Sequence, residues 1–279
     1  MKVTVCPSGG LANRMRAIMS GIALARDTGR DIEVIWARDR GLNAPYSSLF
    51  DPSRLEAPLI EISPFDYYLR YIVPRKKNLY LSRLWQRKHF AAAFFDEESF
   101  VRRFVEHPEA LRKFVAGVDG DVYFFSGLEF YDYDADDYRR AFLPPSRRVL
   151  ERADSFGATP QCTVGLHIRR TDNANSIASS PLALFEDAME RELAADPSVC
   201  FYLASDDNSV KAALAARFGD KVVFNPWQAR RDTPQGIVDA LAEMIVLSRT
   251  RRIYGSYFST YSVAAATLGQ VPLQVLSAK

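Results

Sequence analysis

The sequence predicts an α/β protein with two Rossmann-like domains that face each other across a cleft. Three observations predict it. The chain has 279 residues, and at about 150 residues per domain this length suits two compact domains or one large one. Its beginning reads as strand, glycine turn, helix and strand, and from about residue 160 onward strand-like and helical runs alternate. Hydrophobic residues make up 48% and charged residues 25% of the chain, which excludes disorder as its main state.

The N-terminal run has the pattern of a βαβ unit. Lys2–Cys6 suits a strand, and Pro, Ser and two Gly at 7–10 end it. Apolar residues then recur at spacings of four and three, as on one face of a helix: Leu11, Met15, Ile18, Ile22 and Ala25. Gly29 follows this helix and Ile32–Trp36 is the next strand. A helix that connects two strands in this way favours a parallel sheet.

The C-terminal half alternates more regularly. Its strand-like runs are Cys162–Ile168, Val199–Ala204, Lys221–Asn225, Arg252–Gly255 and Pro272–Leu276. Its helical patterns cover 182–195, 208–218, 236–249 and 259–268. Strands and helices in this alternation are typical of a doubly wound Rossmann-like domain.

The middle of the chain differs in charge from both ends. Residues 65–95 hold seven Lys and Arg against one acid, among many aromatic residues, whereas residues 117–137 hold seven acids and no Lys or Arg. Pro and Gly gather at 144–160, and we place the domain boundary there. The N-terminal domain is then 1–155, with the basic-aromatic stretch as an insertion, and the C-terminal domain is 156–279.

Cysteine and histidine content argues against disulfides and metal. Each of the three cysteines, Cys6, Cys162 and Cys200, sits in an apolar strand-like run, which predicts buried free thiols. No Cys/His cluster has metal-ligand spacing, so we expect no metal site. The N-terminus lacks the apolar segment of a signal peptide, and no run approaches the roughly 18 apolar residues of a membrane span. We therefore expect a cytoplasmic protein.

The first motif is the glycine turn and helix start at 7–16, PSGGLANRMR. Free backbone amides at such a helix start can bind an anion, and the helix dipole adds about 0.3–1 kcal/mol. Gly10 and Asn13 are therefore candidate ligand-binding residues, and Arg14 can also reach a ligand from the first turn. The alternative is a plain βα turn in which Asn13 and Arg14 are solvated.

The second motif is GLHIRRTD at 165–172, where an apolar strand ends in charged residues. Ligands of open α/β sheets bind at the carboxyl ends of strands, where His167, Arg169, Arg170 and Asp172 fall. A guanidinium forms bidentate, charge-assisted bonds to phosphate, worth about 1.5–3 kcal/mol each. The alternative is a surface Arg pair bonded to Asp172, with Arg170 holding the loop.

Two further motifs place polar residues at strand ends and on a buried helix. YLASDD at 202–207 ends in acids that can bind ribose or cap the next helix. Asp207 or Asn208 suits the cap, and Asp206 is a candidate ligand-binding residue.

Glu243 lies in an apolar helical pattern. If it is buried there, its carboxylate needs a partner, such as the paired N–H donors of guanine; a solvated helix face is the alternative. Ser256, Ser259 and Thr260 follow strand 252–255 and open a helix, with more hydroxyls than a cap requires.

In the order GGLANR, HIRRTD, YLASDD and LAEMIVLS…GSYFSTYS, these motifs resemble the superfamily of α-1,6-, α-1,2- and protein O-fucosyltransferases. The likeness is loose over 1–36 and good over 160–270. It implies a GT-B-like pair of Rossmann-type domains, an acceptor-side domain at 1–155 and a GDP-sugar-binding domain at 156–279. It further implies inverting transfer of fucose from GDP-fucose to a hydroxyl of a glycan, without a metal.

The resemblance also implies roles for single residues. Arg169 would bind the β-phosphate, His167 the nucleotide, and Glu243 the guanine. Ser259 and Thr260 would meet the diphosphate, Asn13 would face the donor from the other domain, and Arg170 and Asp172 would shape the sugar site.

One departure concerns the acceptor chemistry. Asn173 and Ile177 stand where the α-1,6 enzymes have a Lys and a Glu, so their base and relay are missing. Base candidates left open are Asp172, Asp39, Asp51 and Glu129. Two rival interpretations follow: an enzyme of this fold with another GDP-sugar, and a non-catalytic nucleotide-sugar-binding protein.

The basic-aromatic stretch 65–95 suits either an acceptor cleft, for a free or lipid-linked glycan, or a peripheral contact with the anionic inner face of a membrane. A solvated, partly packed helical pair is the alternative. Nucleic acid is disfavoured by the acidic stretch 117–137 and by a net charge of only +2.

Overall fold

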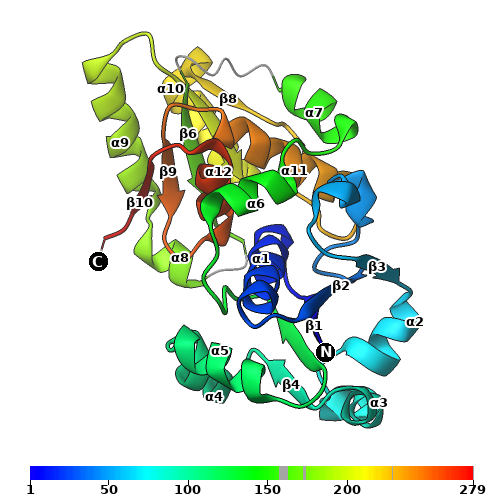
Figure 1. Ribbon diagram of the computed structural model, residues 1–279. Helices are drawn as coiled ribbons and strands as arrows, with labels where there is room; N and C mark the ends of the chain where they lie inside the picture. Colours follow the sequence, from blue (N-terminus) through cyan, green and yellow to red (C-terminus); the bar gives the residue numbers. More distant parts are fainter. Residues whose placement is uncertain (157–162, 172–173, 228, 279) are drawn as a thin grey trace. The chain divides into compact units, whose positions relative to one another are not determined.

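The computed structural model describes residues 1–156, 163–171, 174–227 and 229–278 (Figure 1). The chain forms two compact units, Met1–Pro144 with Arg231–Pro234, and Pro145–Arg230 with Gln235–Lys279. Each unit contains a five-stranded sheet in which every neighbouring pair of the named strands is parallel. Two Rossmann-like sets of strands and helices are therefore present, as the sequence predicts.

The first unit has the strand order β3-β2-β1-β5-β4. Its strands are β1 (Lys2–Pro7), β2 (Asp31–Ala37), β3 (Leu59–Ile62), β4 (Ala92–Phe95) and β5 (Val122–Ser126). Its longer helices are α1 (Leu11–Asp27), α3 (Leu81–His89), α5 (Pro108–Gly117) and α6 (Ala135–Phe142), and the short α2 (Pro64–Asp66) and α4 (Glu98–Phe100) each run into a π-helical turn, Tyr67–Tyr71 and Val101–Val105.

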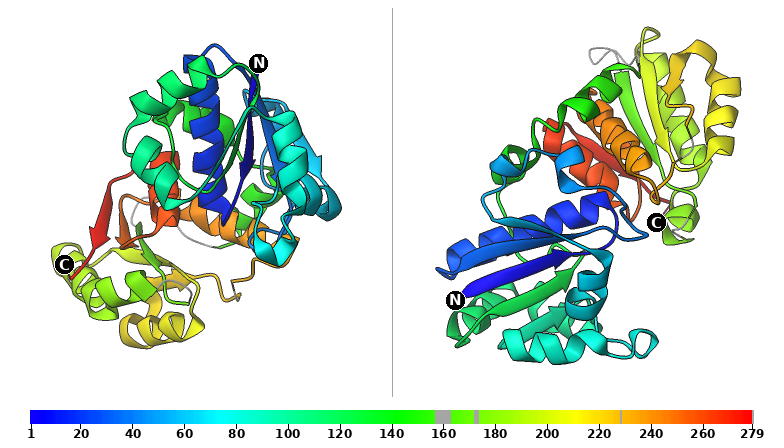
Figure 2. Two further views of the ribbon diagram at one scale, coloured as in Figure 1. Left: turned by 90° about the horizontal axis from the view of Figure 1, so that it is seen from below. Right: turned by 90° about the vertical axis from the view of Figure 1, so that its right-hand side faces the viewer.

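Helices cover both faces of this first sheet (Figure 2). On one face Val3, Val5 and Phe124 pack with residues of α1 and α5. On the other, Cys6 and Tyr123 pack with aromatic residues of the 67–71 turn. The expected strands β1 and β2 are confirmed. The sequence patterns predict none of the other three strands: β4 ends the basic-aromatic stretch, β5 lies within the acidic stretch, and β3 precedes both.

The second unit has the strand order β10-β9-β6-β7-β8. Its strands are β6 (Thr163–Ile168), β7 (Cys200–Ser205), β8 (Val222–Phe224), β9 (Ile253–Ser256) and β10 (Leu273–Leu276). Its helices are α7 (Arg147–Asp154), α8 (Ala174–Ser179), α9 (Leu182–Ala195), α10 (Asn208–Phe218), α11 (Pro234–Ser248) and α12 (Thr260–Gly269). All five expected strands and four expected helices occur, with ends that differ by one or two residues, except that Cys162 lies outside the described residues.

The core of the second unit forms around β6, which is buried along its whole length. Val164, Leu166 and Ile168 pack with Phe185 and Met189 of α9. On the opposite face Gly165 lets α11 approach closely, because a Cβ there would lie only 2.9 Å from the side chain of Leu247. The close fit fixes α11, and with it Glu243, against the sheet.

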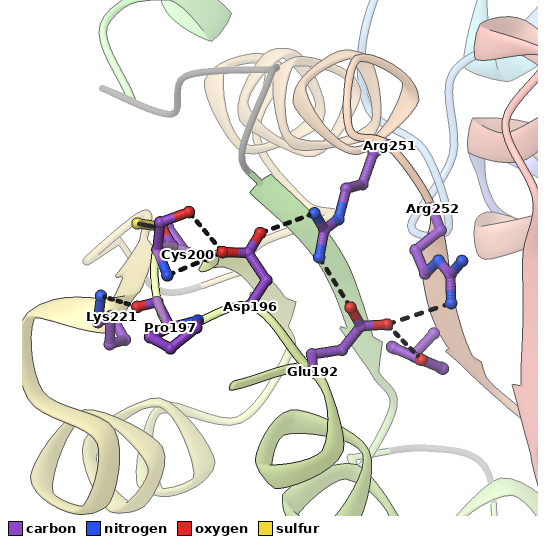
Figure 3. A network of polar contacts seen from close by, with 9 residues as sticks. Glu192, Asp196, Pro197, Cys200, Lys221, Arg251 and Arg252 are labelled. Carbon is purple, nitrogen blue, oxygen red and sulfur yellow. Dashed lines mark hydrogen bonds and ion pairs between the residues drawn. The ribbon is translucent and has the colours of Figure 1, made fainter. Parts of the chain in front are cut away.

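A polar network fixes α9 at the amino-terminal edge of this sheet (Figure 3). Glu192 accepts hydrogen bonds from Arg251 at 2.8 Å, Arg252 at 3.2 Å and the Tyr254 hydroxyl at 2.7 Å. Arg251 also pairs with Asp196 at 3.2 Å. The carboxylate of Glu192 thus has three donors and ties the end of α9 to the start of β9.

The prediction of buried free thiols is confirmed for Cys6 and wrong for Cys200, while Cys162 lies outside the described residues. Cys6 is buried, which raises the pKa of its thiol to about 12, whereas Cys200 is half-buried. Among the described residues no helix has both the length and the apolar composition to cross a membrane.

Candidate functional site

The second sheet has a topological switch point between β6 and β9. From β6 the chain continues to β7 and β8 on one side, and β9 and β10 then extend the other side. Ligands of such sheets bind in the crevice at the carboxyl ends of the two strands that flank the switch. The predicted residues meet there, because the Ser256 hydroxyl accepts from the Arg169 amide at 3.0 Å and donates to the His167 carbonyl at 3.3 Å.

His167 is a buried, neutral side chain at this edge. Its Nδ1 lies 3.4 Å from the Ser259 hydroxyl, and its ring stacks on Tyr261 at a centroid distance of 4.7 Å. Burial, and then the positive charge of Arg169, lower the pKa of His167 to about 4. The imidazole can therefore offer a flat surface and a hydrogen bond to a ligand, but at neutral pH it is not the imidazolium that a general acid would need.

Asp206 shapes the loop that carries Arg169. Its carboxylate accepts from the Arg170 amide at 2.8 Å and the Thr171 hydroxyl at 2.7 Å, and lies 3.6 Å from Nε of Arg169. Burial acts to raise the pKa of Asp206, but these hydrogen bonds outweigh it and keep the pKa below the ordinary value. Asp206 thus fixes the loop from β7, next to Arg169. Asp172, the other predicted catalytic residue, lies outside the described residues.

The guanidinium of Arg170 links the loop after β6 to the segment before α9. It donates to the carbonyl of Arg169 at 3.1 Å and to that of Ser180 at 2.8 Å. Desolvation lowers its pKa. This geometry matches the loop-holding alternative considered for Arg170.

The N-terminus of α12 differs from that of α10. Asp207 caps α10 by accepting from the Ser209 amide at 2.8 Å, as the sequence predicts for this acid. Ser259 holds the N-cap position of α12, but its side chain makes no capping bond and lies near His167 instead. The hydroxyl of Ser259 therefore does not act as the cap of α12. The ten-residue helix α12 begins at Thr260, directly after β9, so its first backbone amides lie at the switch-point edge.

Glu243 on α11 is a buried carboxylate with an incomplete set of partners. It is 9% exposed, and its Oε1 accepts no hydrogen bond from the described residues. The nearest cation, Nζ of Lys211 on α10, lies 3.9 Å away. Burial raises the pKa of Glu243 from 4.5 to about 7, against the opposing effect of Lys211. The solvated-face alternative for Glu243 is therefore wrong.

Lys211 is a functional candidate that the motif analysis did not single out. It is 2% exposed, and its Nζ donates to the carbonyls of Asn225 at 2.9 Å and Trp227 at 3.4 Å. The signal for it is its position on the apolar face of α10, three residues before the buried Leu214. Close to Glu243 the hydroxyl of Tyr202 also has no hydrogen-bond partner among the described residues.

In the first unit the glycine turn lies at the carboxyl ends of β1 and β5. Gly10 holds the N-cap position of α1 and provides no side-chain cap. Gly9 has a φ of +79°, and Gly127 after β5 sits so close that a Cβ there would lie 2.8 Å from the Ser8 carbonyl and 3.5 Å from Asn13 Cβ. The backbone is thus packed tightly around Asn13, at the edge where ligands of parallel sheets bind.

Arg14 is buried, so the solvated alternative is wrong for this residue. It is fully buried, with Nε donating to the Gly9 carbonyl at 3.0 Å and Nη2 lying 2.9 Å from Asp39 Oδ1. Its guanidinium also stacks over Trp36 at 5.1 Å. Arg14 therefore ties the glycine turn to the end of β2.

The three described base candidates already have partners. Asp39 pairs with Arg14 and accepts from the amides of Gly41 and Leu42. Asp51 caps the turn at 52–54, and Glu129 accepts from a tyrosine hydroxyl at 3.3 Å. Within the described ranges, no three His, Cys, Asp or Glu side chains gather as metal ligands.

No known family profile and no curated protein sequence matches the chain, but solved structures do. The NodZ α-1,6-fucosyltransferase soaked with GDP-fucose aligns with a TM-score of 0.63 and 18% identity, over 98% of this chain and 93% of that one; NodZ from Bradyrhizobium is also found, at 0.59 and 18%, over 98% and 94%.

Two other fucosyltransferases align over nearly the whole chain. POFUT1 in complex with GDP has a TM-score of 0.56 and 12% identity, over 99% and 98%. A mutant of Arabidopsis thaliana FUT1 in complex with GDP has 0.60 and 15%, over 98% and 69%. The fold is thus one that fucosyltransferases share, which confirms at the level of the fold the resemblance that the motifs indicate.

Proposed function

We propose that the protein is an inverting glycosyltransferase that transfers fucose from GDP-fucose to a hydroxyl of a glycan, without a metal. The observation that carries this proposal is the switch-point edge of the second sheet. It combines Arg169, the N-terminus of α12 and the buried Glu243, whose Oε1 has no hydrogen-bond partner among the described residues, and both Arg169 and Glu243 act electrostatically on Tyr261 of α12. Similar solved structures are described as in complex with GDP or soaked with GDP-fucose, which supports the choice of donor.

Glu243 would recognise the base. Guanine presents two adjacent N–H donors, and a carboxylate accepts both, whereas adenine and uracil offer no such pair. Binding would supply Oε1 of Glu243 with the hydrogen-bond partner that it lacks among the described residues. The neutral ring of His167 and the hydroxyl of Tyr202 are the neighbouring groups suited to the nucleoside.

The diphosphate would be held by Arg169 and the first amides of α12. Both are donors that need no proton transfer. The amides of α12 are part of a helix, and Nε of Arg169 lies 3.6 Å from the Asp206 carboxylate. During transfer the acceptor oxygen bonds to C1 of fucose while the bond from C1 to the phosphate oxygen breaks, and GDP leaves with the bonding electrons. Preorganised donors at the leaving phosphate are the main electrostatic contribution expected for such a step.

The first unit would bind the acceptor, and Gly10 and Asn13 are the residues of this unit that we propose for contact with the donor. The acceptor proton needs a base. Asp39, Asp51 and Glu129 are committed to other contacts, so Asp172 is the base candidate that we retain.

Isothermal titration with GDP, GDP-fucose, GDP-mannose and UDP-glucose, each with and without EDTA, tests the donor site. We expect guanine-selective binding that EDTA does not change and that Arg169→Ala weakens. Arg249→Ala, which removes an exposed Arg of the same unit, is the matched control. Absence of binding to every guanine nucleotide would overturn the proposal.

A GDP-release assay with a glycan panel then separates the rival interpretations. Acceptor-dependent release from GDP-fucose supports the transferase, and the configuration of the new linkage tests inversion. Faster release from GDP-mannose identifies another donor sugar. Tight donor binding without release on any acceptor favours the non-catalytic interpretation.

A further inference from the structure

Helix α3 of the first unit buries polar side chains and exposes leucines. Ser82 is 0% and Gln86 3% exposed, whereas Leu84 on the outer face is 80% exposed and Leu81 is 50% exposed. A helix that packs on a core normally shows the opposite pattern. The outer face of α3 is therefore apolar for a reason other than folding.

Specific hydrogen bonds keep α3 in this orientation. The Ser82 hydroxyl donates to the Ile72 carbonyl at 2.6 Å, and the Gln86 amide donates to the carbonyls of Arg70 at 2.9 Å and Ile72 at 3.1 Å. A rotation that buried Leu84 would break all three bonds and leave these buried groups unpaired. These hydrogen bonds thus fix the orientation of α3 in which its leucines are exposed.

The turn before α3 adds a further exposed leucine. Leu79 and Tyr80 both have a φ of +53°, a left-handed conformation that residues other than glycine adopt at a cost. Hydrogen bonds from the Asn78 side chain and the Leu79 and Tyr80 amides close this turn. The strained turn presents Leu79, which is 78% exposed, just before the exposed face of α3.

Basic side chains surround these leucines. Residues 75–88, which we call the basic-leucine segment, contain six Lys and Arg, and no Asp or Glu occurs from residue 67 to residue 95. All six are exposed, and none of them forms an ion pair with the described part of the chain. The basic residues are Arg75, Lys76, Lys77, Arg83, Arg87 and Lys88. In both views of Figure 2, α3 lies at the periphery of the first unit.

We propose that the basic-leucine segment docks on the surface of a bilayer that contains anionic phospholipid, with Leu79, Leu81 and Leu84 entering the headgroup region. Basic side chains around exposed apolar ones match such a surface in both charge and polarity. A nucleic acid would use the positive charge but leave the leucines in water. A second copy of the chain would bring the same six positive charges against each other if the segment paired with itself.

Co-sedimentation of the full chain with vesicles tests this inference. We expect binding to vesicles of phosphatidylcholine with phosphatidylglycerol, and none to phosphatidylcholine alone. Lys76→Glu/Lys77→Glu should weaken the binding by roughly twentyfold or more, because each basic charge near an anionic surface contributes about fivefold. Leu79→Ser/Leu84→Ser should weaken it comparably, although it leaves the charge unchanged.

Matched controls change the same kinds of residue elsewhere. Lys113→Glu/Arg147→Glu alters the charge equally, and Val275→Ser removes an exposed apolar side chain from the second unit. Both should bind like the wild type, and thermal melting establishes that all variants fold.

Three results would overturn the inference. The first is failure of the wild type to bind anionic vesicles, or binding that neither segment variant weakens. The second is tight binding to single-stranded RNA that Lys76→Glu/Lys77→Glu weakens and Leu79→Ser/Leu84→Ser leaves unchanged. The third is a dimer in sedimentation velocity that Leu79→Ser/Leu84→Ser converts to a monomer.

Discussion

Two glutamates of the second unit, Glu192 and Glu243, lie on helices at opposite edges of one sheet. Their surroundings shift their pKa values in opposite directions. Glu192, at the amino-terminal edge, has three donors, and although burial acts to raise its pKa, the hydrogen bonds from Tyr254 and Arg251 keep it below the ordinary value. Glu243, at the other edge, has an oxygen that accepts from no donor in the described part of the chain, a lysine Nζ at 3.9 Å and a pKa raised to about 7.

The difference separates a residue that serves the fold from one suited to a ligand. A carboxylate fully provided with donors gains nothing from further contacts, so Glu192 stabilises the unit and offers no binding energy. A buried carboxylate that lacks donors is held in place by the packing around it, and its missing hydrogen bonds remain available to a partner. The following predictions test whether the two edges divide their roles in this way.

The largest effect is expected at Arg169. Arg169→Ala should lower kcat of fucose transfer by about two to three decades, as the loss of one preorganised donor at a developing charge does. Arg169→Lys should recover little, because lysine lacks the planar fork. Initial rates at saturating GDP-fucose measure both variants.

Arg251→Ala supplies the control at the opposite edge. It removes a donor from Glu192 and should lower the melting temperature while leaving kcat unchanged. Near wild-type turnover in Arg169→Ala would remove Arg169 from the mechanism.

Glu243→Gln should weaken GDP binding by about tenfold to a hundredfold, because a charge-assisted hydrogen bond contributes about 1.5–3 kcal/mol. The effect should be specific to guanine, so the weak affinity for UDP should not change. Titration calorimetry of GDP and UDP on both proteins measures this selectivity. Equal losses for the two nucleotides would mean that the substitution disturbs the site as a whole.

Lys211→Met should weaken GDP binding at pH 7 by roughly threefold to tenfold, through its effect on Glu243. The charge of Lys211 lowers the pKa of that carboxyl, so without it a higher pH is needed to ionise Glu243. A purely structural role of Lys211 would reduce affinity at every pH and leave the midpoint of the pH profile in place. Lys221→Met is the matched control, since Lys221 also donates to a backbone carbonyl of this unit.

The sequence predicts the second unit better than the first for a physical reason. Parallel strands that helices cover on both sides are continuous apolar runs, and the turns after β6 and β7 bring charged residues at once. In the first unit β3 and β4 are short edge strands with partly exposed residues, and β5 lies within the acidic stretch. Their apolar signal is brief, and charge dominates the pattern around them.

The same limit applies to single residues of the site. The positions of His167, Arg169 and Ser256 follow from strand ends, which are local features of the sequence. The burial of Arg14 depends on Asp39 and Trp36, and the pairing of Lys211 with Glu243 joins two helices. Such contacts depend on tertiary packing, which spacing along the chain does not encode.

The pH dependence of stability should have opposite signs at the two glutamates. The folded chain binds the Glu243 proton more tightly than the unfolded chain does, so this residue favours folding at low pH. Its contribution is lost as pH rises from 4.5 to about 7. Between pH 5 and pH 8 the melting temperature of the wild type should therefore fall relative to that of Glu243→Gln.

GDP affinity should change in the other direction over the same range. Since the carboxylate is the form that accepts from guanine, GDP binding should strengthen by up to about tenfold from pH 6 to pH 8. A flat pH profile of GDP affinity in the wild type would contradict the assignment of Glu243 to the base.

The smallest effect is expected at Glu192. Glu192→Gln keeps the shape and an acceptor for Tyr254 but loses the charge that Arg251 and Arg252 bind, and at neutral pH it should cost about 1 kcal/mol. Because the pKa of Glu192 is lowered on folding, its contribution is present above the ordinary pKa of a glutamate and disappears as pH falls below it. The melting temperatures of wild type and variant should therefore differ at pH 7 and converge in acid, while their GDP affinities stay equal throughout. If Glu192→Gln weakened GDP binding, the two edges of the sheet would be coupled, and the division between a fold-supporting and a ligand-binding carboxylate would fail.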